Sequence, residues 1–176
     1  MRIISGKFKG KKLIGFDIEG TRPTMDRIKE SLFGMIQSNL KNSVCLDLFA
    51  GSGSLGLEAL SNGAKCCYFV DNNKIILDIL SKNLKDINNA YIIKDNYEEA
   101  LKQFKKLNIK FDLVFLDPPY LLNLINNSLL NLIELDLLSK EAIIVCEYTQ
   151  EKINNYDLNL IKEKQYKDKI IKIYQK

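Results

Sequence analysis

Short apolar runs alternate with amphipathic segments along most of the chain. The runs are continuous in Val, Ile, Leu, Phe and Cys, which is typical of strands buried on both faces of a sheet. They lie at residues 44–49, 66–70, 91–94, 111–116 and 142–147. Helical spacing is clearest over residues 76–87 and also covers the leucine-rich stretch 121–138. Repeated strand–helix units predict parallel pairing with right-handed crossovers, and therefore a doubly wound α/β fold.

The two ends of the chain depart from this alternation. Residues 2–5 and 11–14 indicate two short strands, a small β-hairpin joined by a lysine-rich turn with two glycines. Apolar residues then recur at helical spacing over residues 24–36. Residues 158–164 and 169–174 indicate two strands with little room for a helix between them. We therefore expect a mostly parallel, seven-stranded sheet with an antiparallel C-terminal hairpin at one edge.

Length and composition fit one globular domain. The chain has 176 residues, 46% of them hydrophobic and 27% charged, which predicts a single domain over residues 1–176. We divide this domain into an N-terminal appendage, residues 1–40, and a core, residues 44–176. No apolar run approaches the roughly 20 residues that span a bilayer, and the first 30 residues are too charged for a secretion signal. We expect a soluble, cytoplasmic protein without membrane contact.

Histidine is absent, which excludes catalysis by imidazole and any histidine-ligated metal centre. The cysteines have no CxxC spacing, and each lies in an apolar run; they are Cys45, Cys66, Cys67 and Cys146. We expect reduced cysteines that serve as small core residues, and no metal site.

The net charge of +4 is concentrated near the N-terminus. Residues 1–30 carry eight basic and four acidic side chains, whereas residues 31–176 carry eighteen of each. All three arginines, Arg2, Arg22 and Arg27, lie in this first part. Arginine presents a planar fork of donors that suits phosphate groups and base edges. The pattern favours contact with nucleic acid, and solvated charges near a chain end are the alternative.

A glycine-rich loop, DLFAGSGSLG at residues 47–56, follows the first core strand. Gly51 and Gly53 let the backbone turn sharply and approach a ligand, and the helix expected from about Ser54 offers unpaired N–H groups. Asp71 lies 20 residues after Gly51, at a spacing that suits hydrogen bonds from ribose hydroxyl groups. These features predict a nucleotide-like cofactor.

The loop alone leaves the kind of cofactor open. Gly51, Gly53 and Gly56 match G-x-G-x-x-G, so a nicotinamide-dependent oxidoreductase is a competing interpretation. Asp47 favours a different cofactor, because a carboxylate beside the loop suits an ammonium group better than a pyrophosphate. A tight turn without any ligand is a third interpretation.

The tetrapeptide Asp117, Pro118, Pro119, Tyr120 follows the apolar run 111–116 and should face the same crevice as the glycine loop. An amino group on a nucleobase is a poor nucleophile, because its lone pair is delocalised into the ring. If the Asp117 carboxylate and the Pro118 carbonyl accept its two hydrogens, the nitrogen becomes more tetrahedral and its lone pair points at an electrophilic methyl group. The prolines fix the backbone, and Tyr120 offers a face for stacking the base. A rigid turn without chemistry is the alternative.

Together, the DLFAGSG loop and DPPY resemble the class I S-adenosylmethionine-dependent methyltransferases that act on exocyclic amino groups of nucleic-acid bases. The N-terminal run MRIISGKFKGKKL and the segment TRPTMDRIKESLF at residues 21–33 narrow the resemblance to the RsmD-type 16S ribosomal RNA guanine-N2 methyltransferases of bacteria. The resemblance covers nearly the whole chain. It implies a Rossmann-like fold, S-adenosylmethionine as cofactor, and 16S rRNA or the assembling small ribosomal subunit as partner.

The resemblance also implies roles for individual residues. Those implied to bind the cofactor are Asp47, Phe49, Ala50, Gly51, Ser52, Gly53, Asp71, Asn72, Asp95, Asn96 and Asp117. The implied catalytic residues, which would hold the target guanine, are Asp117, Pro118, Pro119 and Tyr120. Those implied to contact RNA are Arg2, Lys7, Lys9, Lys11, Arg22, Thr24 and Arg27. The chain departs from the family at Leu121, Leu122 and Ala142, none of which takes part in this chemistry.

Other interpretations stay open at this stage. One is a related DPPY enzyme that acts on another rRNA position or on adenine N6 of DNA, although a small domain without a separate recognition region argues against DNA specificity. A dinucleotide oxidoreductase leaves DPPY and the basic N-terminus unexplained. A non-catalytic RNA-binding module leaves the acidic, glycine and DPPY elements unexplained. We expect the protein to be a monomer.

Overall fold

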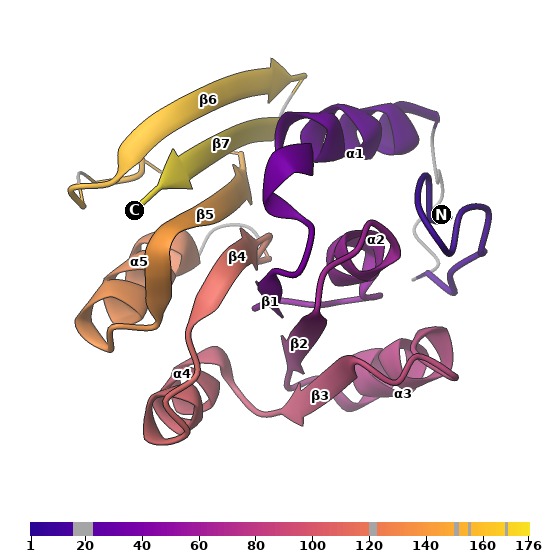
Figure 1. Cartoon of the computed structure of the whole chain (residues 1–176), viewed down its shortest axis with the longest axis horizontal. Coiled ribbons are helices and arrows are strands. Elements are labelled where there is room, and N and C mark those ends of the chain that lie inside the picture. Colours follow the sequence, from indigo (N-terminus) through magenta and orange to yellow (C-terminus); the bar gives the residue numbers. More distant parts are fainter. Residues whose placement is uncertain (16–22, 120–122, 150–151, 155, 168) are drawn as a thin grey trace.

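Among the described residues, seven strands form one central sheet in the computed structural model of the chain (Figure 1). The structure describes residues 1–15, 23–119, 123–149, 152–154, 156–167 and 169–176, and only the backbone of residues 23–25. The strands are β1 Val44–Asp47, β2 Cys66–Asp71, β3 Ala90–Lys94, β4 Phe111–Leu116, β5 Leu138–Tyr148, β6 Asn159–Tyr166 and β7 Lys169–Gln175. Their order across the sheet is β3-β2-β1-β4-β5-β7-β6.

Strands β1 to β5 pair in parallel, and β7 pairs antiparallel with both β5 and β6. Strand β1 lies between β2 and β4, so the strand order reverses there. In doubly wound sheets, ligands bind beyond the carboxyl ends of the strands at such a reversal. The predicted fold, a mostly parallel sheet with an antiparallel C-terminal hairpin, is confirmed.

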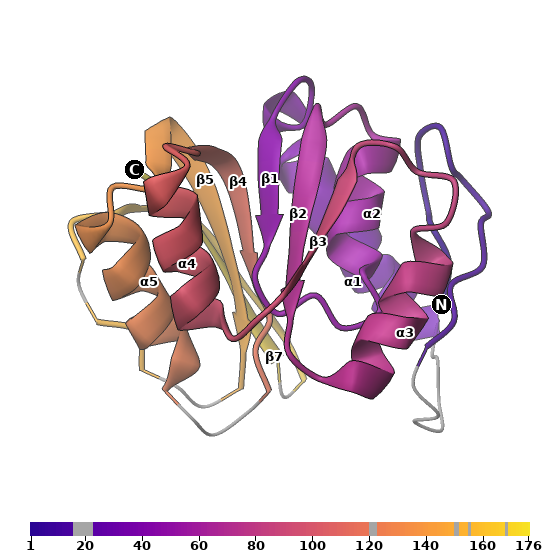
Figure 2. The same cartoon turned by 90° about the horizontal axis from the view of Figure 1, so that it is seen from below.

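Helices cover both faces of the sheet (Figure 2). They are α1 Pro23–Met35, α2 Ser54–Ser61, α3 Lys74–Asn83, α4 Tyr97–Lys106 and α5 Leu124–Glu134, and a short 3₁₀ helix covers Gln37–Asn39. Buried residues of α1, α2 and α3 pack on one face, and those of α4 and α5 pack on the other. Each strand in the middle of the sheet is therefore shielded from water on both sides, which explains its continuous apolar sequence.

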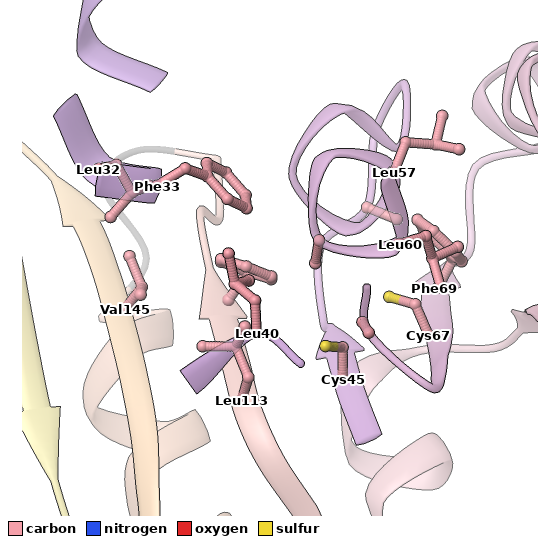
Figure 3. Packing of buried hydrophobic residues seen from close by; sticks show 14 of the residues in the cluster. Leu32, Phe33, Leu40, Cys45, Leu57, Leu60, Cys67, Phe69, Leu113 and Val145 are labelled. Atoms are coloured by element: carbon pink, nitrogen blue, oxygen red, sulfur yellow. The ribbon is translucent and has the colours of Figure 1, made fainter. Parts of the chain in front are cut away.

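Side chains along each buried strand alternate between the two faces. On β4, Phe115 faces α1, α2 and α3, whereas Leu116 faces α4 and α5. Leu32 and Phe33 of α1 lie over the first of these faces (Figure 3), where the ring of Phe33 is 5.8 Å from that of Phe115. Helix α1 is confirmed, and the structure makes it part of the hydrophobic core, although it falls in the segment expected as an appendage.

The first 15 residues run beside α2 and α3 and form less sheet than the sequence indicates. A single antiparallel bridge joins Arg2 and Lys12. The N–H groups of Ile4 and Ser5 donate instead to the Glu58 carboxylate of α2, at 2.9 and 2.8 Å. The expected hairpin is shorter than predicted because α2 offers its backbone a better acceptor than a second strand does.

The leucine-rich stretch 121–138 is not one helix. Helix α5 ends at Glu134, Asp136 adopts a left-handed φ of 53°, and β5 begins at Leu138. Three polar residues, 139–141, follow immediately and concealed the start of this strand in the sequence. Residues 121 and 122 lie outside the described part of the chain.

The expectations for cysteines hold in the structure. All four are free, and each lies on a strand, at a buried position or, for Cys66, a half-buried one. Within the described part of the chain, no helix combines the length and the apolar character needed to cross a membrane.

Candidate functional site

Two adjoining pockets lie at the carboxyl ends of the parallel strands. The α1 pocket, of about 430 Å³, lies between α1, the glycine loop and the ends of β4 and β5. The β2 pocket, of about 590 Å³, lies beyond the ends of β2 and β3. Phe49, Gly51, Asp117 and Pro119 line both pockets. The glycine loop and the DPPY segment therefore face one crevice, as the topology predicts.

Asp71, at the end of β2, holds the glycine loop. Its Oδ2 accepts a hydrogen bond from the Gly51 N–H at 3.1 Å, and its Oδ1 accepts one from the Asn73 N–H at 3.0 Å. Gly51 and Gly53 have φ values of 54° and 79°, in the left-handed region that glycine adopts without strain. Each carboxylate oxygen can accept a second hydrogen bond, so Asp71 remains available to a ligand in the β2 pocket, which it lines.

Asn83 of α3 supports the same loop from the other side, and sequence reasoning missed it. Its Nδ2 donates to the Ser52 carbonyl and to the Ile14 carbonyl, both at 2.9 Å. The Ile14 N–H donates back to Asn83 Oδ1 at 2.8 Å. The glycine loop is thereby attached to the N-terminal segment through one amide group, a contact that no local sequence signal reveals.

Asp47 of β1 lies at the base of the α1 pocket and is only 2% exposed. Burial raises its pKa to about 7, and the hydrogen bond that it accepts from the Gly56 N–H at 3.0 Å acts against this rise. Gly56 itself packs on β2: a Cβ atom there would lie 2.3 Å from a ring carbon of Phe69. Close packing of α2 on the sheet thus explains the third glycine of G-x-G-x-x-G without a dinucleotide.

The β2 pocket combines polar groups with aromatic rings. The predicted cofactor residues that line it include Asp71, Asn72, Asp95 and Asn96. The rings of Phe49 and Tyr97 line it as well, with centroids 5.5 Å apart. The Asn96 side chain also caps α4, by accepting a hydrogen bond from the Glu99 N–H at 2.9 Å. Such a pocket suits a nucleoside, whose base contacts the rings and whose hydroxyl groups face carboxylates.

Asp117 directly follows β4, at the place where the two pockets join. The residue is half-buried and keeps some surface toward the pockets. Burial raises its pKa to about 8, the nearby Glu147 adds to the rise, and Lys169 opposes it. Pro118 and Pro119 line the α1 pocket beside it. Tyr120, the predicted stacking residue, lies outside the described residues.

Helix α1 contributes a buried ion pair to the α1 pocket. Lys29 Nζ lies 3.2 Å from Glu58 Oε2, and the two side chains are 8% and 0% exposed. The ammonium group also donates to the Arg2 carbonyl at 2.7 Å and to the Ser54 hydroxyl at 3.0 Å. Burial lowers the pKa of Lys29, and Glu58 opposes this. The sequence did not indicate this pair, because a lysine on an amphipathic helix usually points to solvent.

A second ion pair closes the α1 pocket near β5 and β7. Glu147 Oε1 accepts a hydrogen bond from Lys169 Nζ, and both residues line the pocket. Sequence reasoning missed Lys169, whose strand was predicted but whose position at the site was not. Although carboxylates gather here, no group of three or more Cys, Asp or Glu side chains in the described ranges is arranged to hold a metal ion.

Comparison with known proteins identifies the family. The family described as Conserved hypothetical protein 95 matches residues 1–175. Ribosomal RNA small subunit methyltransferase D of Haemophilus influenzae is 41% identical over 170 residues, which cover 93% of this chain and 88% of that protein. The chain belongs to the RsmD family.

Solved structures agree with membership of the RsmD family. The structure of yhhF from Escherichia coli has a TM-score of 0.88 and 31% identity, and the match covers 100% of this chain and 97% of that one. The structure of SMU.776 in complex with SAH has a TM-score of 0.67 and 15% identity, covering 86% of this chain and 49% of that one. At this identity the second match shows a shared fold alone.

The basic residues of this RsmD family member differ in their surroundings. Lys7, Lys9 and Arg27 are exposed, and Lys11 is half-buried. Arg2 is exposed, but its Nε lies 3.1 Å from Asp26 Oδ2, so part of its charge is compensated. Arg22 and the side chain of Thr24 lie outside the described residues. The N-terminal segment therefore begins at the α1 pocket, which Met1 lines, and carries its exposed lysines toward the C-terminal end of α2, where the Lys7 N–H donates to the Ser61 carbonyl at 2.7 Å.

Proposed function

We propose that the chain is an S-adenosylmethionine-dependent methyltransferase that modifies the exocyclic N2 amino group of a guanine in 16S rRNA. The position and surroundings of the Asp117 carboxyl group are the main support for this proposal. Its carboxyl group lies where the two pockets join, and among the described residues no donor forms a hydrogen bond with it. Burial disfavours the ionised form of this half-buried carboxyl group, so the arrangement favours a ligand whose donors hydrogen-bond to the carboxylate.

The residues present fit S-adenosylmethionine, which supplies an electrophilic methyl group when bound. Asp71 suits the ribose hydroxyl groups, and Asp95 with Asn96 suits the adenine edge at the far end of the β2 pocket. Phe49 forms an apolar wall shared by both pockets. Asp47, in the α1 pocket, offers a negative group to the ammonium of the methionine portion. A pyrophosphate would instead meet two acidic groups beside the glycine loop, which disfavours a dinucleotide.

The DPPY segment is suited to hold the guanine. Asp117 and the Pro118 carbonyl accept the two hydrogens of its amino group and direct the nitrogen lone pair toward the methyl group. The new nitrogen–carbon bond would form as the carbon–sulfur bond of the sulfonium breaks, leaving a neutral thioether. Positive charge would then develop on the nitrogen, and the Asp117 carboxylate would stabilise it until one amino proton passes to solvent. A base inside a helix cannot reach these groups, so the target guanine lies in a loop or is flipped out of its stack.

A related activity on adenine N6 of DNA or on another rRNA position is the second candidate function. To separate the two, labelled S-adenosylmethionine is incubated with unmethylated small subunits, free 16S rRNA and duplex DNA. We expect label in the RNA substrates and none in DNA. Label in DNA alone would contradict the proposed substrate. Comparison of the two RNA substrates shows whether the naked RNA or the assembled particle is preferred.

An Asp71→Ala variant is expected to bind S-adenosylmethionine roughly tenfold to a hundredfold more weakly than the wild type. The substitution removes hydrogen bonds to a charged acceptor, each worth about 1.5 to 3 kcal/mol, and releases the Gly51 N–H. Calorimetry without RNA measures the affinity. Asp78→Ala, at an exposed position of α3, is the matched control. Tight binding of NADH with no binding of S-adenosylmethionine would refute the cofactor assignment.

We also propose that residues 1–40 supply RNA affinity. Replacing four lysines of the N-terminal segment with alanine should flatten the salt dependence of RNA binding, since each lost phosphate contact reduces the log–log slope by about 0.7 to 0.9. These residues are Lys7, Lys9, Lys11 and Lys12. The matched control removes four lysines near α4, which are Lys102, Lys105, Lys106 and Lys110. S-adenosylmethionine affinity should stay unchanged in both variants. An unaltered slope in the first variant would place the RNA on another surface.

A further inference from the structure

Three ionisable side chains lie on neighbouring strands, at the end of the sheet where the parallel strands have their carboxyl ends. In the pairing of β4 with β5, Leu116 lies opposite Cys146, so the next residues, Asp117 and Glu147, are also level. In the antiparallel pairing of β5 with β7, Tyr148 lies opposite Ile170, which brings Lys169 to the same edge. Since β4, β5 and β7 are neighbours in that order, the three charges follow one another across the sheet.

The three side chains also share one face of the sheet. Phe115, Val145 and Ile171 belong to the core cluster beneath α1, and Leu116 and Cys146 belong to the cluster on the other face. Because side chains alternate along a strand, residues 117, 147 and 169 return to the α1 face. All three line the α1 pocket. The pocket therefore presents an acceptor, a second acceptor and a donor in this order.

This order complements the pairing edge of guanine. That edge carries the N2 amino donor, the N1–H donor and the O6 acceptor in sequence, whereas adenine offers an unprotonated N1 acceptor beside its single amino group. We infer that Glu147 and Lys169 select guanine, with Glu147 accepting from N1–H and Lys169 donating to O6 while Asp117 holds N2. This inference rests on the proposed function, because it assumes a flipped base held at Asp117.

The ion pair leaves Glu147 the capacity to accept a hydrogen bond from a base. Glu147 uses Oε1 for Lys169, and within the described ranges no donor forms a hydrogen bond with its Oε2. A carboxylate offers about four lone-pair directions, and an ammonium group carries three protons. Glu147 is 8% exposed, so an unprotonated ring nitrogen placed against it would leave two acceptors facing each other without water. Sites of this kind reject the wrong base strongly.

The test replaces the target guanine by 2,6-diaminopurine, in an RNA whose methylated position has first been mapped. This base keeps the 2-amino group but has an acceptor at N1 and a donor at position 6. Wild-type kcat/KM on the diaminopurine RNA should be about 10²-fold below that on the guanine RNA. Glu147→Gln presents an amide donor to N1. In this variant we therefore expect kcat/KM on the guanine RNA to exceed that on the diaminopurine RNA by less than about tenfold. Without cofactor, the wild type should bind the guanine RNA more tightly than the diaminopurine RNA, and Glu147→Gln should reduce this difference between the two dissociation constants.

Glu163→Gln is the matched control, because Glu163 pairs with Lys172 on the same edge hairpin, away from the pocket. It should keep the wild-type ratio. Lys169→Met, a second variant, should also reduce the preference in kcat/KM for the guanine RNA. The comparison of the two RNAs with the wild-type protein does not require any variant to fold. Equal wild-type rates on the two RNAs, or an unchanged ratio in Glu147→Gln, would overturn the inference alone. Absence of N2 methylation on the guanine RNA would overturn the proposed function, and the inference with it.

Discussion

An Asp117→Ala variant is expected to lose about 10² to 10³ in kcat, with a much smaller loss of RNA affinity. In the proposed mechanism, the carboxylate accepts a hydrogen bond that strengthens as the amino nitrogen becomes tetrahedral and positively charged, so its removal should affect the transition state more than binding. The magnitude is that of deleting one preorganised hydrogen bond to a developing charge. Single-turnover methylation of the preferred RNA at saturating cofactor measures the rate constant of the chemical step.

Two further variants define the role of the DPPY segment. Asp117→Asn keeps an acceptor oxygen without the charge, so its rate constant should lie between those of the wild type and Asp117→Ala. Tyr120→Ala should instead weaken engagement of the base by roughly 1 to 3 kcal/mol of lost stacking, while S-adenosylmethionine still binds. A near-normal rate constant in Asp117→Ala would show that the amino group is activated in another way.

The raised pKa of Asp117 makes the same reaction sensitive to pH. Burial and Glu147 raise the pKa to about 8, so below pH 8 a growing share of the protein carries a neutral carboxyl group at this position. Only the ionised carboxylate stabilises the positive charge that develops on the nitrogen, and we therefore expect the single-turnover rate constant to rise with pH up to about 8 and then level. The Asp117→Asn variant should lack this rise.

Lys29→Met is expected to destabilise the protein by about 3 to 5 kcal/mol, the largest loss of stability that we predict. The substitution keeps most of the side-chain volume but leaves the fully buried Glu58 without its cation, and breaking a buried pair on one side has this cost. It also removes the donor to the Arg2 carbonyl. Urea unfolding measures the change in the free energy of unfolding.

A second substitution separates the charge from the packing. Glu58→Gln in the Lys29→Met background removes the uncompensated charge, so the double variant should recover a large part of the lost stability. Lys41→Met, at an exposed position, is the control and should change the free energy of unfolding by less than about 0.5 kcal/mol. A Lys29→Met variant as stable as this control would mean that the N–H groups of Ile4 and Ser5 stabilise the Glu58 carboxylate without the ammonium group.

The elements in the middle of the sheet could be predicted from the sequence because each is buried on both faces. Strand β4, Phe111–Leu116, agrees residue for residue with its apolar run. The start of β5 was missed, since the three polar residues 139–141 follow Leu138 and interrupt the apolar run. The N-terminal pairing was overestimated, because the acceptor that the backbone of Ile4 and Ser5 uses belongs to Glu58, more than 50 positions away.

The site likewise contains residues that local motifs identify and residues that distant parts of the chain contribute. The glycine loop and the DPPY segment are short motifs next to predicted strands, so the topology alone brings them together at the switch point. Lys29, Asn83 and Lys169 reach the site from elements whose presence was predicted but whose packing was not. Their side chains are ordinary surface residues by type, and only the assembled structure shows that they support the glycine loop or line the α1 pocket.

The chemical identity of the methylated nucleoside tests the central claim most directly. RNA labelled by the wild-type protein with S-adenosylmethionine is digested to nucleosides, and the label is compared with authentic methylated standards. The structure and the proposed hydrogen bonds to an exocyclic amino group predict that the label appears in N2-methylguanosine. Label in a ring-methylated nucleoside, such as N7-methylguanosine, or in N6-methyladenosine would contradict the account.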